Sequence, residues 1–172
     1  MKKILLIAIV LLFILPSCKK NTTDNSTPVN TITATVNGVD KTFNAKVTAS
    51  QTNLGGTNVL IISGAEGSET NSGTIAIEID TTAIITEGTY PVKSGIPNGF
   101  NSRTVISYIE GFASFFPSPN TAAPNSVTIS RISSTNVQGT FNVTLSEGSL
   151  GTASSNKTFT KGKFNVTINQ RN

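Results

Sequence analysis

Apolar and polar residues alternate along most of the chain after residue 30. The clearest stretches run from Thr31 to Asn37, from Gly73 to Asp80, from Phe141 to Ser146 and from Phe164 to Asn169, with an aliphatic or aromatic residue at every second position. A period of two is typical of a strand with one buried face. The pattern therefore predicts half-buried β-strands in these stretches.

One stretch departs from this alternation. Val59 to Ile62 is continuously apolar, which favours a strand covered on both faces. No window has the spacing of an amphipathic helix, and glycine-rich or asparagine-rich breaks recur between the strands. We therefore expect an all-β fold, an antiparallel β-sandwich of about nine or ten strands, with an up-and-down β-barrel as the alternative.

Two segments near the C-terminus are similar to each other. Gly139 to Leu145 reads GTFNVTL, and Gly162 to Ile168 reads GKFNVTI. We interpret them as two neighbouring antiparallel strands that present the same face to the core, because such neighbours are stabilised by matched cross-strand pairs. The alternative, a duplicated binding element, is less favoured because two copies fall short of a repeat array.

The first residues have a different pattern. Two lysines precede twelve apolar residues from Ile4 to Leu15, and Pro16-Ser17-Cys18 follows. A positive start, a short apolar run and a small residue are typical of a secretory signal. The run is shorter than the roughly 20 residues that a transmembrane helix needs. We expect residues 1–17 to be a signal peptide.

Leu15-Pro16-Ser17-Cys18 also resembles the lipobox of bacterial lipoproteins, from which only Pro16 departs. In that family the cysteine receives a thioether-linked diacylglycerol and becomes the first residue of the mature chain, and two or more acyl chains give stable membrane attachment. The resemblance implies lipidation at Cys18, the single cysteine of the chain. The alternatives are a cleaved signal with an incidental thiol and an uncleaved anchor.

The segment from Lys19 to Asn30 is polar apart from Val29. Such a composition predicts a flexible tether with a reach of roughly 20 Å. We therefore expect residues 18–30 to form the lipidated cysteine and its tether, and residues 31–172 to form a single all-β domain.

Charge adds little to this interpretation. The chain has 13 basic and 9 acidic residues, and four of the lysines lie in the signal and the tether. The domain is therefore close to neutral. Nucleic-acid-binding proteins show a clustered basic face, so we expect no nucleic-acid partner.

The residues available for catalysis are few. The chain has no histidine, and the resemblance assigns its one cysteine to the lipid. Histidine-dependent nucleophiles, thiolate catalysis and the commonest metal ligands are therefore excluded. No glycine loop of the kind that cradles phosphate is found. We expect no catalytic residues, no metal site and no cofactor.

Two pairs of carboxylates are the remaining candidates. Glu78 and Asp80 lie on one predicted strand, roughly 6.7 Å apart along the backbone, a separation that inverting glycoside hydrolases use. Glu66 and Glu69 lie in a glycine-bounded segment that is a candidate calcium loop, although it lacks alternating Asp and Asn ligands. We interpret both pairs as solvated surface residues.

A candidate binding loop spans Gly111 to Asn125, which begins as a strand and becomes proline-rich. Phe115 and Phe116 are adjacent, so in an extended chain they point to opposite sides and one is exposed. Together with Phe112 and Phe100 they form the candidate binding loop, because exposed aromatic loops often mark partner sites. The alternative is that the rings plug one end of the core.

Short turn-and-strand phrases also resemble those of a known family. They are Val36-Asn37-Gly38 with Thr42-Phe43, Gly88-Thr89-Tyr90, Val127-Thr128-Ile129, Gly139-Thr140-Phe141 and Gly162-Lys163-Phe164. In this order they resemble small single-domain all-β lipoproteins of Bacteroidota-type bacteria, a domain family of unknown function. The resemblance covers most of Ile32–Ile168. A tryptophan often follows the first Asn-Gly in that family, and Phe43 would fill its role here. The resemblance implies location and fold and adds no chemistry.

The sequence thus favours a non-catalytic, membrane-tethered binding or accessory module of the cell envelope, whose partner is an envelope protein or a glycan. Lys19-Lys20-Asn21 lacks the acidic run that argues for surface export, so the periplasmic side of the outer membrane is the default location. The first alternative is a β-barrel carrier of a lipid or small apolar ligand. A carrier needs unfilled inward positions, whereas residues such as Ile75, Ile77, Phe141 and Phe164 would fill a sandwich core. A carboxylate-dependent glycoside hydrolase is the least favoured alternative.

Overall fold

The computed structural model describes residues 27–67, 72–93, 102–117, 125–148 and 155–169. These residues form eleven strands: β1 (Thr31–Val36), β2 (Val39–Phe43), β3 (Ala45–Leu54), β4 (Thr57–Ala65), β5 (Thr74–Thr81), β6 (Gly88–Pro91), β7 (Arg103–Glu110), β8 (Ala113–Pro117), β9 (Ser126–Ile132), β10 (Asn136–Glu147) and β11 (Asn156–Thr167). The all-β prediction is confirmed. Within these ranges there is no helix of the length and apolar character that crossing a bilayer requires.

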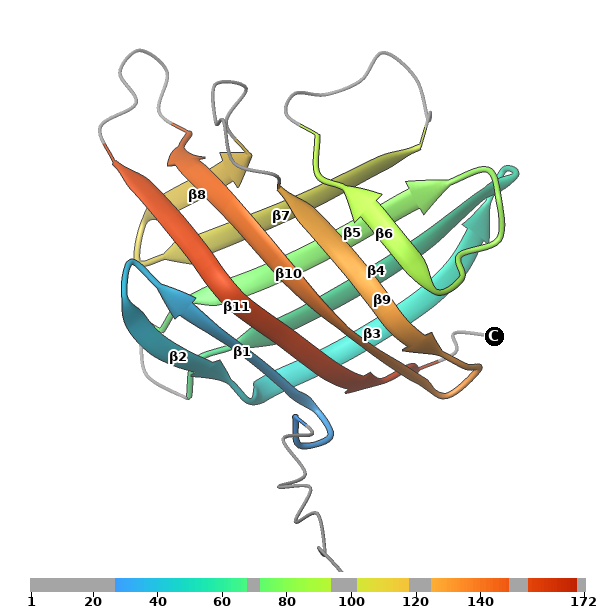
Figure 1. Ribbon diagram of the computed structural model, residues 1–172, viewed down its shortest axis with the longest axis horizontal. Helices are drawn as coiled ribbons and strands as arrows, with labels where there is room; N and C mark the ends of the chain where they lie inside the picture. The colour runs from blue at the N-terminus through green and yellow to red at the C-terminus, as the bar shows by residue number, and fades with distance from the viewer. Residues whose placement is uncertain (1–26, 68–71, 94–101, 118–124, 149–154, 170–172) are drawn as a thin grey trace, which may run out of the picture.

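The strands belong to one antiparallel sheet that curls into a nearly closed barrel (Figure 1). Its path is β2-β1-β11-β10-β8-β7-β5-β4-β3, and β9 pairs with β10 and β6. The long strand β10 pairs with β9 along its first half and with β8 at its end, on the same edge. Of the two expected architectures, the sheet therefore has the barrel-like one, because its strands follow one curved path rather than two facing layers.

The sheet closes at β2 and β3. These two strands are separated only by Asn44, and β2 pairs with β1 whereas β3 pairs with β4. Ala49 in β3 forms a parallel bridge with Ile168, and its carbonyl accepts the Asn169 N–H at 2.8 Å. The end of β11 thus meets the far edge of the sheet.

Aromatic rings fill the barrel interior. Tyr108 contacts Phe43, Phe115 and Phe159, and Phe159 also contacts Phe141, with ring centroids 5.2–6.4 Å apart. All five side chains are at most 2 % exposed. Edge-to-face and tilted contacts of this kind add to the stability gained from burial. The expected core residues Ile75, Ile77, Phe141 and Phe164 are also buried.

The two similar C-terminal segments pair with each other in β10 and β11. Gly139 lies opposite Phe164, and Phe141 lies opposite Gly162. A Cβ at Gly139 would lie 2.4 Å from Cζ of Phe164, and one at Gly162 would lie 2.7 Å from the Phe141 ring. Each ring therefore covers the glycine of the other strand, which explains the repeated Gly-x-Phe phrase. The prediction of neighbouring antiparallel strands with a shared core face is confirmed.

The continuously apolar stretch in β4 is only partly covered on its outer face. Leu60 and Ile62 are fully buried and Val59 is buried, but Ile61 is 39 % exposed. Its neighbours across the sheet are Ser50 and Glu78, one small and one charged. The prediction that this strand is covered on both faces is therefore wrong at Ile61.

Candidate functional site

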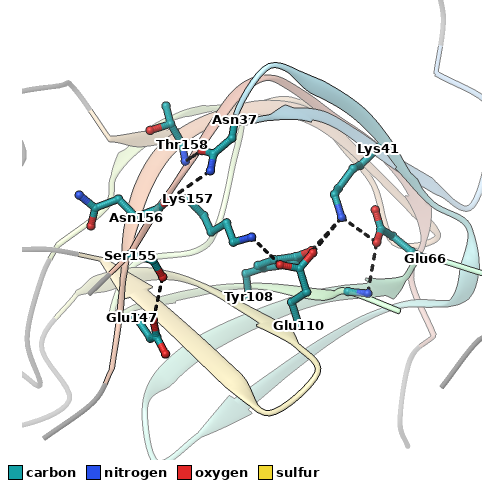
Figure 2. Close-up of polar contacts among 11 residues, drawn as sticks. Asn37, Lys41, Glu66, Tyr108, Glu110, Glu147, Ser155, Asn156, Lys157 and Thr158 are labelled. Atoms are coloured by element: carbon teal, nitrogen blue, oxygen red, sulfur yellow. Dashed lines mark hydrogen bonds and ion pairs between the residues drawn. The ribbon is translucent and has the colours of Figure 1, made fainter. Parts of the chain in front are cut away.

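Four charged side chains lie at inward-facing positions at one end of the barrel. Each is two residues from a buried position of its own segment: Lys41 precedes Phe43, Glu66 follows Gly64, Glu110 follows Tyr108 and Lys157 precedes Phe159. Side chains alternate between the two faces of a strand, so these residues continue the inward face beyond the aromatic core. We name Lys41, Glu66, Tyr108, Glu110 and Lys157 the charged mouth (Figure 2).

Glu110 and Lys41 are the centre of the charged mouth. The Lys41 ammonium donates to Glu66 Oε2 at 3.0 Å, to the Tyr108 hydroxyl at 3.2 Å and to Glu110 Oε1 at 3.1 Å. Glu110 Oε1 also accepts from the Tyr108 hydroxyl at 3.1 Å, and its Oε2 accepts from Lys157. Figure 2 shows the two lysines approaching Glu110 from two sides. The three hydrogens of the Lys41 ammonium are therefore all engaged.

These contacts shift the pKa values of Lys41, Tyr108 and Glu110. The hydrogen bond from Lys157 lowers the pKa of Glu110 to about 2, against an opposing effect of partial burial and with support from Lys41 and Tyr108. Burial raises the pKa of Tyr108 to about 12. Burial alone would lower the pKa of Lys41, but its hydrogen bonds to Glu66, Tyr108 and Glu110 raise it above the ordinary value. Lys41, Tyr108 and Glu110 therefore keep their protonation states near neutral pH.

The rim of the mouth is fixed by side-chain contacts to the backbone. Asn37 and Gly38 both have positive φ values, 49° and 86°, which suit the tight turn between β1 and β2. Asn37 Oδ1 accepts the Thr158 N–H at 2.8 Å, and Asn37 Nδ2 donates to the Asn156 carbonyl at 3.2 Å. This turn is thereby attached to the start of β11, the strand that carries Lys157.

The β7–β8 hairpin beside the mouth carries exposed apolar side chains. Ile109 and Phe116 are each 47 % exposed, and Phe112 at the turn is fully exposed. We name these three residues the apolar hairpin. Phe115 is buried against Tyr108, with the Lys157 ammonium 5.4 Å from its ring centroid. Phe115 and Phe116 thus point to opposite sides, as their adjacency predicts.

The structure divides the candidate binding loop. Phe112 and Phe116 are surface residues, Phe115 belongs to the core, and Phe100 lies outside the described residues. The two exposed phenylalanines flank the buried one on the same short hairpin. Both interpretations of the loop therefore apply, each to different rings.

Glu78 and Asp80 lie on the outer face of β5, and Arg103 of β7 forms ion pairs with both. Asp80 is only 5 % exposed, and its Oδ1 has no hydrogen-bond partner. The interpretation as a solvated surface pair is therefore wrong for Asp80, because the guanidinium of the neighbouring strand covers it.

Only Glu66 of the second carboxylate pair lies within the described residues. Glu66 points into the charged mouth, where it accepts from Lys41 and from the Gly73 N–H at 3.2 Å. Its expected solvated position is therefore wrong, and Glu69 lies outside the described residues. Within the described ranges, no three or more His, Cys, Asp or Glu side chains are grouped as a metal site requires.

The tether joins the barrel far from the mouth. The Thr27 carbonyl accepts from Asn165 Nδ2 at 2.7 Å, and Asn30 Oδ1 accepts the Thr167 N–H at 2.9 Å. Both contacts are to the end of β11, whereas Lys157 is at its start. The eight residue-to-residue steps of strand from 157 to 165 span roughly 26 Å. Cys18 itself lies outside the described residues.

Sequence reasoning did not identify the charged mouth. The sequence does contain a pattern that corresponds to it. In three strands a charged residue lies two positions from an aromatic residue of the core, as in Lys41/Phe43, Tyr108/Glu110 and Lys157/Phe159. Charge on the inward register at a strand end predicts a polar layer that covers a barrel end. The pattern is informative only once the barrel and its strand neighbours are known.

Comparisons with known proteins give no relatives for this chain. No family model, no curated protein and no solved structure matches it. The resemblance to small lipoproteins stays a prediction, and the functional argument depends on the geometry of the chain itself.

Proposed function

We propose that this chain is a membrane-tethered, non-catalytic binding module of the cell envelope. It binds a partner protein through the barrel end formed by the charged mouth and the apolar hairpin. Lipidation at Cys18 anchors it, and the periplasmic side of the outer membrane is its proposed location.

The observation that carries this proposal is the position of the exposed phenylalanines. Phe112 and Phe116 are the exposed large aromatic residues of the described part of the chain. Both belong to the β7–β8 hairpin, in which β7 ends at Glu110 and β8 begins at Ala113. Aromatic residues are enriched in the centres of protein interfaces. The described end of the tether, Thr27, contacts the other end of β11, so the hairpin lies at the end of the barrel remote from Thr27.

The chemistry of the mouth supports binding over catalysis. A general acid or base works best with a pKa near the operating pH, whereas Glu110 and Tyr108 have pKa values of about 2 and about 12. Glu78 and Asp80, the pair proposed for glycoside hydrolysis, are both held by Arg103. A hydrolase would need at least one of these carboxylates free to meet substrate.

The filled interior argues against a carrier. Phe43 and Phe159 both contact Tyr108 in the space that an apolar ligand would need. The charged mouth then covers this core with polar atoms, so an apolar ligand entering there would have to separate the Lys41–Glu110 ion pair.

A site-specific crosslink in intact cells tests the proposal. A photo-reactive amino acid replaces Phe112 in one variant and Phe116 in another. Leu54 is the matched control, since it is 63 % exposed and lies in the β3–β4 hairpin. It is beside the start of β4, whereas Glu66 follows the other end of that strand. We expect one envelope protein to be captured at both phenylalanine positions and not at Leu54, with capture lost in Cys18→Ala. Identical capture at all three positions, or none, would overturn the proposal.

A further inference from the structure

Two lysines on β11 form no ion pair with any acidic residue in the part of the chain that the structure describes. Lys161 and Lys163 are both exposed. The ion pairs of the described residues instead use Lys41, Arg103 and Lys157. We name Lys161 and Lys163 the basic strip. Its charge is therefore available to a partner outside the chain.

The basic strip lies directly beside the tether. Lys163 pairs with Thr33 of β1, two residues along from the Thr31–Asn165 pair where the tether enters the sheet. A shallow hollow of about 170 Å³ has both Lys163 and the tether residue Thr27 in its lining. A second hollow, of about 310 Å³, is lined by both lysines of the strip. The last described part of the tether and the basic strip thus share one face of the barrel.

The backbone at Lys161 is unusual for a lysine. Its φ is 53°, in the left-handed region that favours glycine. Thr160 and Lys161 together lie opposite Asn142, so this is a β-bulge, a feature that redirects side chains.

One acidic residue, Asp40, shares a hollow with the strip and is hydrogen-bonded to a neighbouring strand. Asp40 lines the same hollow as both lysines, and its Oδ1 accepts the Thr35 hydroxyl at 2.6 Å. It forms no ion pair with Lys161 or Lys163. The face therefore keeps an excess of one positive charge beside the tether.

We propose that the basic strip contacts anionic phospholipid headgroups of the membrane to which the chain is tethered. This inference rests on the lipid anchor of the proposed function. Eight residues lie between Cys18 and Thr27, and their polar composition predicts a flexible chain with a mean span of roughly 16 Å. That span is about two Debye lengths at physiological ionic strength, so a tether with the flexibility predicted from its sequence brings the strip within range of the surface charge. The contact lays the β11–β1 face on the membrane and keeps the charged mouth at the far end of β11.

Lysine acetylation of the full acylated protein tests this contact. The protein is reconstituted in vesicles of phosphatidylcholine alone, or of phosphatidylcholine with added phosphatidylglycerol, and the acetylation rate of each lysine is followed by mass spectrometry. Lys93 is the control, since it is exposed and forms no ion pair among the described residues. It follows β6, and two strands, β9 and β10, lie between β6 and β11 in the sheet.

We expect acetylation of Lys161 and Lys163 to slow about fivefold on the anionic vesicles, with Lys93 unchanged and the difference abolished by high salt. Equal rates on both vesicles, with the protein retained on them, would overturn this inference and leave the anchor intact. A protein that neither vesicle retains would overturn the anchor and the basic-strip contact together. Partner binding is read separately by the crosslink at Phe112.

Discussion

Glu110 is the residue on which the charged mouth depends, and Glu110→Gln tests this directly. The carboxylate accepts from Lys41, Tyr108 and Lys157. Glutamine keeps the size of the side chain and one carbonyl oxygen, but it removes the negative charge between two lysines. The substitution leaves Lys157 without its carboxylate partner and Lys41 with Glu66 alone.

The expected size of the effect follows from the pKa of Glu110. A fall from 4.5 to about 2 corresponds to about 3 kcal/mol if the side chain were fully shielded from water. The side chain is 32 % exposed, so solvent screens part of this interaction. We therefore expect Glu110→Gln to lower the free energy of unfolding at pH 7 by about 1–2 kcal/mol.

The pH dependence supplies a second readout with a definite sign. A carboxylate whose folded pKa lies below its unfolded pKa stabilises the fold above the unfolded value, and this stability is lost as pH falls. For Glu110 the loss occurs between pH 4.5 and about 2. The wild type should therefore lose more stability than Glu110→Gln across this range, and the difference between the two proteins should vanish at its lower end.

Urea unfolding of both proteins at a series of pH values measures this difference. Glu87→Gln is the control, because Glu87 is exposed and forms no ion pair among the described residues. The reasoning is refuted if Glu110→Gln and Glu87→Gln have the same stability at pH 7, or if the wild type and Glu110→Gln lose stability in parallel below pH 4.5.

Three further substitutions have expected outcomes. Gly162→Ala places a Cβ 2.4 Å from the Phe141 carbonyl oxygen, so we expect a loss of about 1–3 kcal/mol in urea unfolding. Arg103→Gln leaves buried Asp80 without its counter-ion, and we expect a loss of about 3 kcal/mol, measured by the same method. Phe112→Ser changes a fully exposed side chain, so we expect unfolding within about 0.5 kcal/mol of the wild type, together with loss of the partner captured through Phe116.

Each substitution has a matched control. Thr140→Ala, on the outer face of β10, is the control for Gly162→Ala and should leave the free energy of unfolding nearly unchanged. A Gly162→Ala protein as stable as Thr140→Ala would contradict the close approach of Phe141 to Gly162. Glu78→Gln should lower the free energy of unfolding less than Arg103→Gln does, because Glu78 is 33 % exposed. The reverse order would contradict the burial of Asp80. Phe115→Ala should cost about 3–5 kcal/mol, which separates loss of fold from loss of binding at Phe112.

Some of the molecule could be predicted from local pattern alone. The all-β class and the inward faces of β1, β5, β10 and β11 follow from alternation, because successive side chains of any strand point to opposite faces whatever its neighbours are. The opposite orientation of Phe115 and Phe116 has the same origin. The pairing of the two Gly-x-Phe segments was also predictable, since matched strands favour one another across an antiparallel ladder.

Other features were decided only by tertiary structure. Alternation says which face of a strand is buried, but it does not say which strands are neighbours or whether the sheet closes. The barrel depends on the division of a long segment into β2 and β3 at Asn44 and on the bridge between Ala49 and Ile168. The burial of Asp80 depends in the same way on its register with Arg103.

The charged mouth shows the physical reason most clearly. Lys41, Glu110 and Lys157 come from three strands separated by long stretches of sequence, and no local pattern specifies that they meet. The pKa shifts of Lys41 and Glu110, and the hydrogen bonds that join all three residues, arise from distances of a few ångströms that exist only after the sheet has curved and closed. The sequence by itself determined strands, faces and class, because these depend on neighbouring residues; the barrel, the charged mouth and the basic strip beside the tether depend on long-range register, which only the folded chain defines.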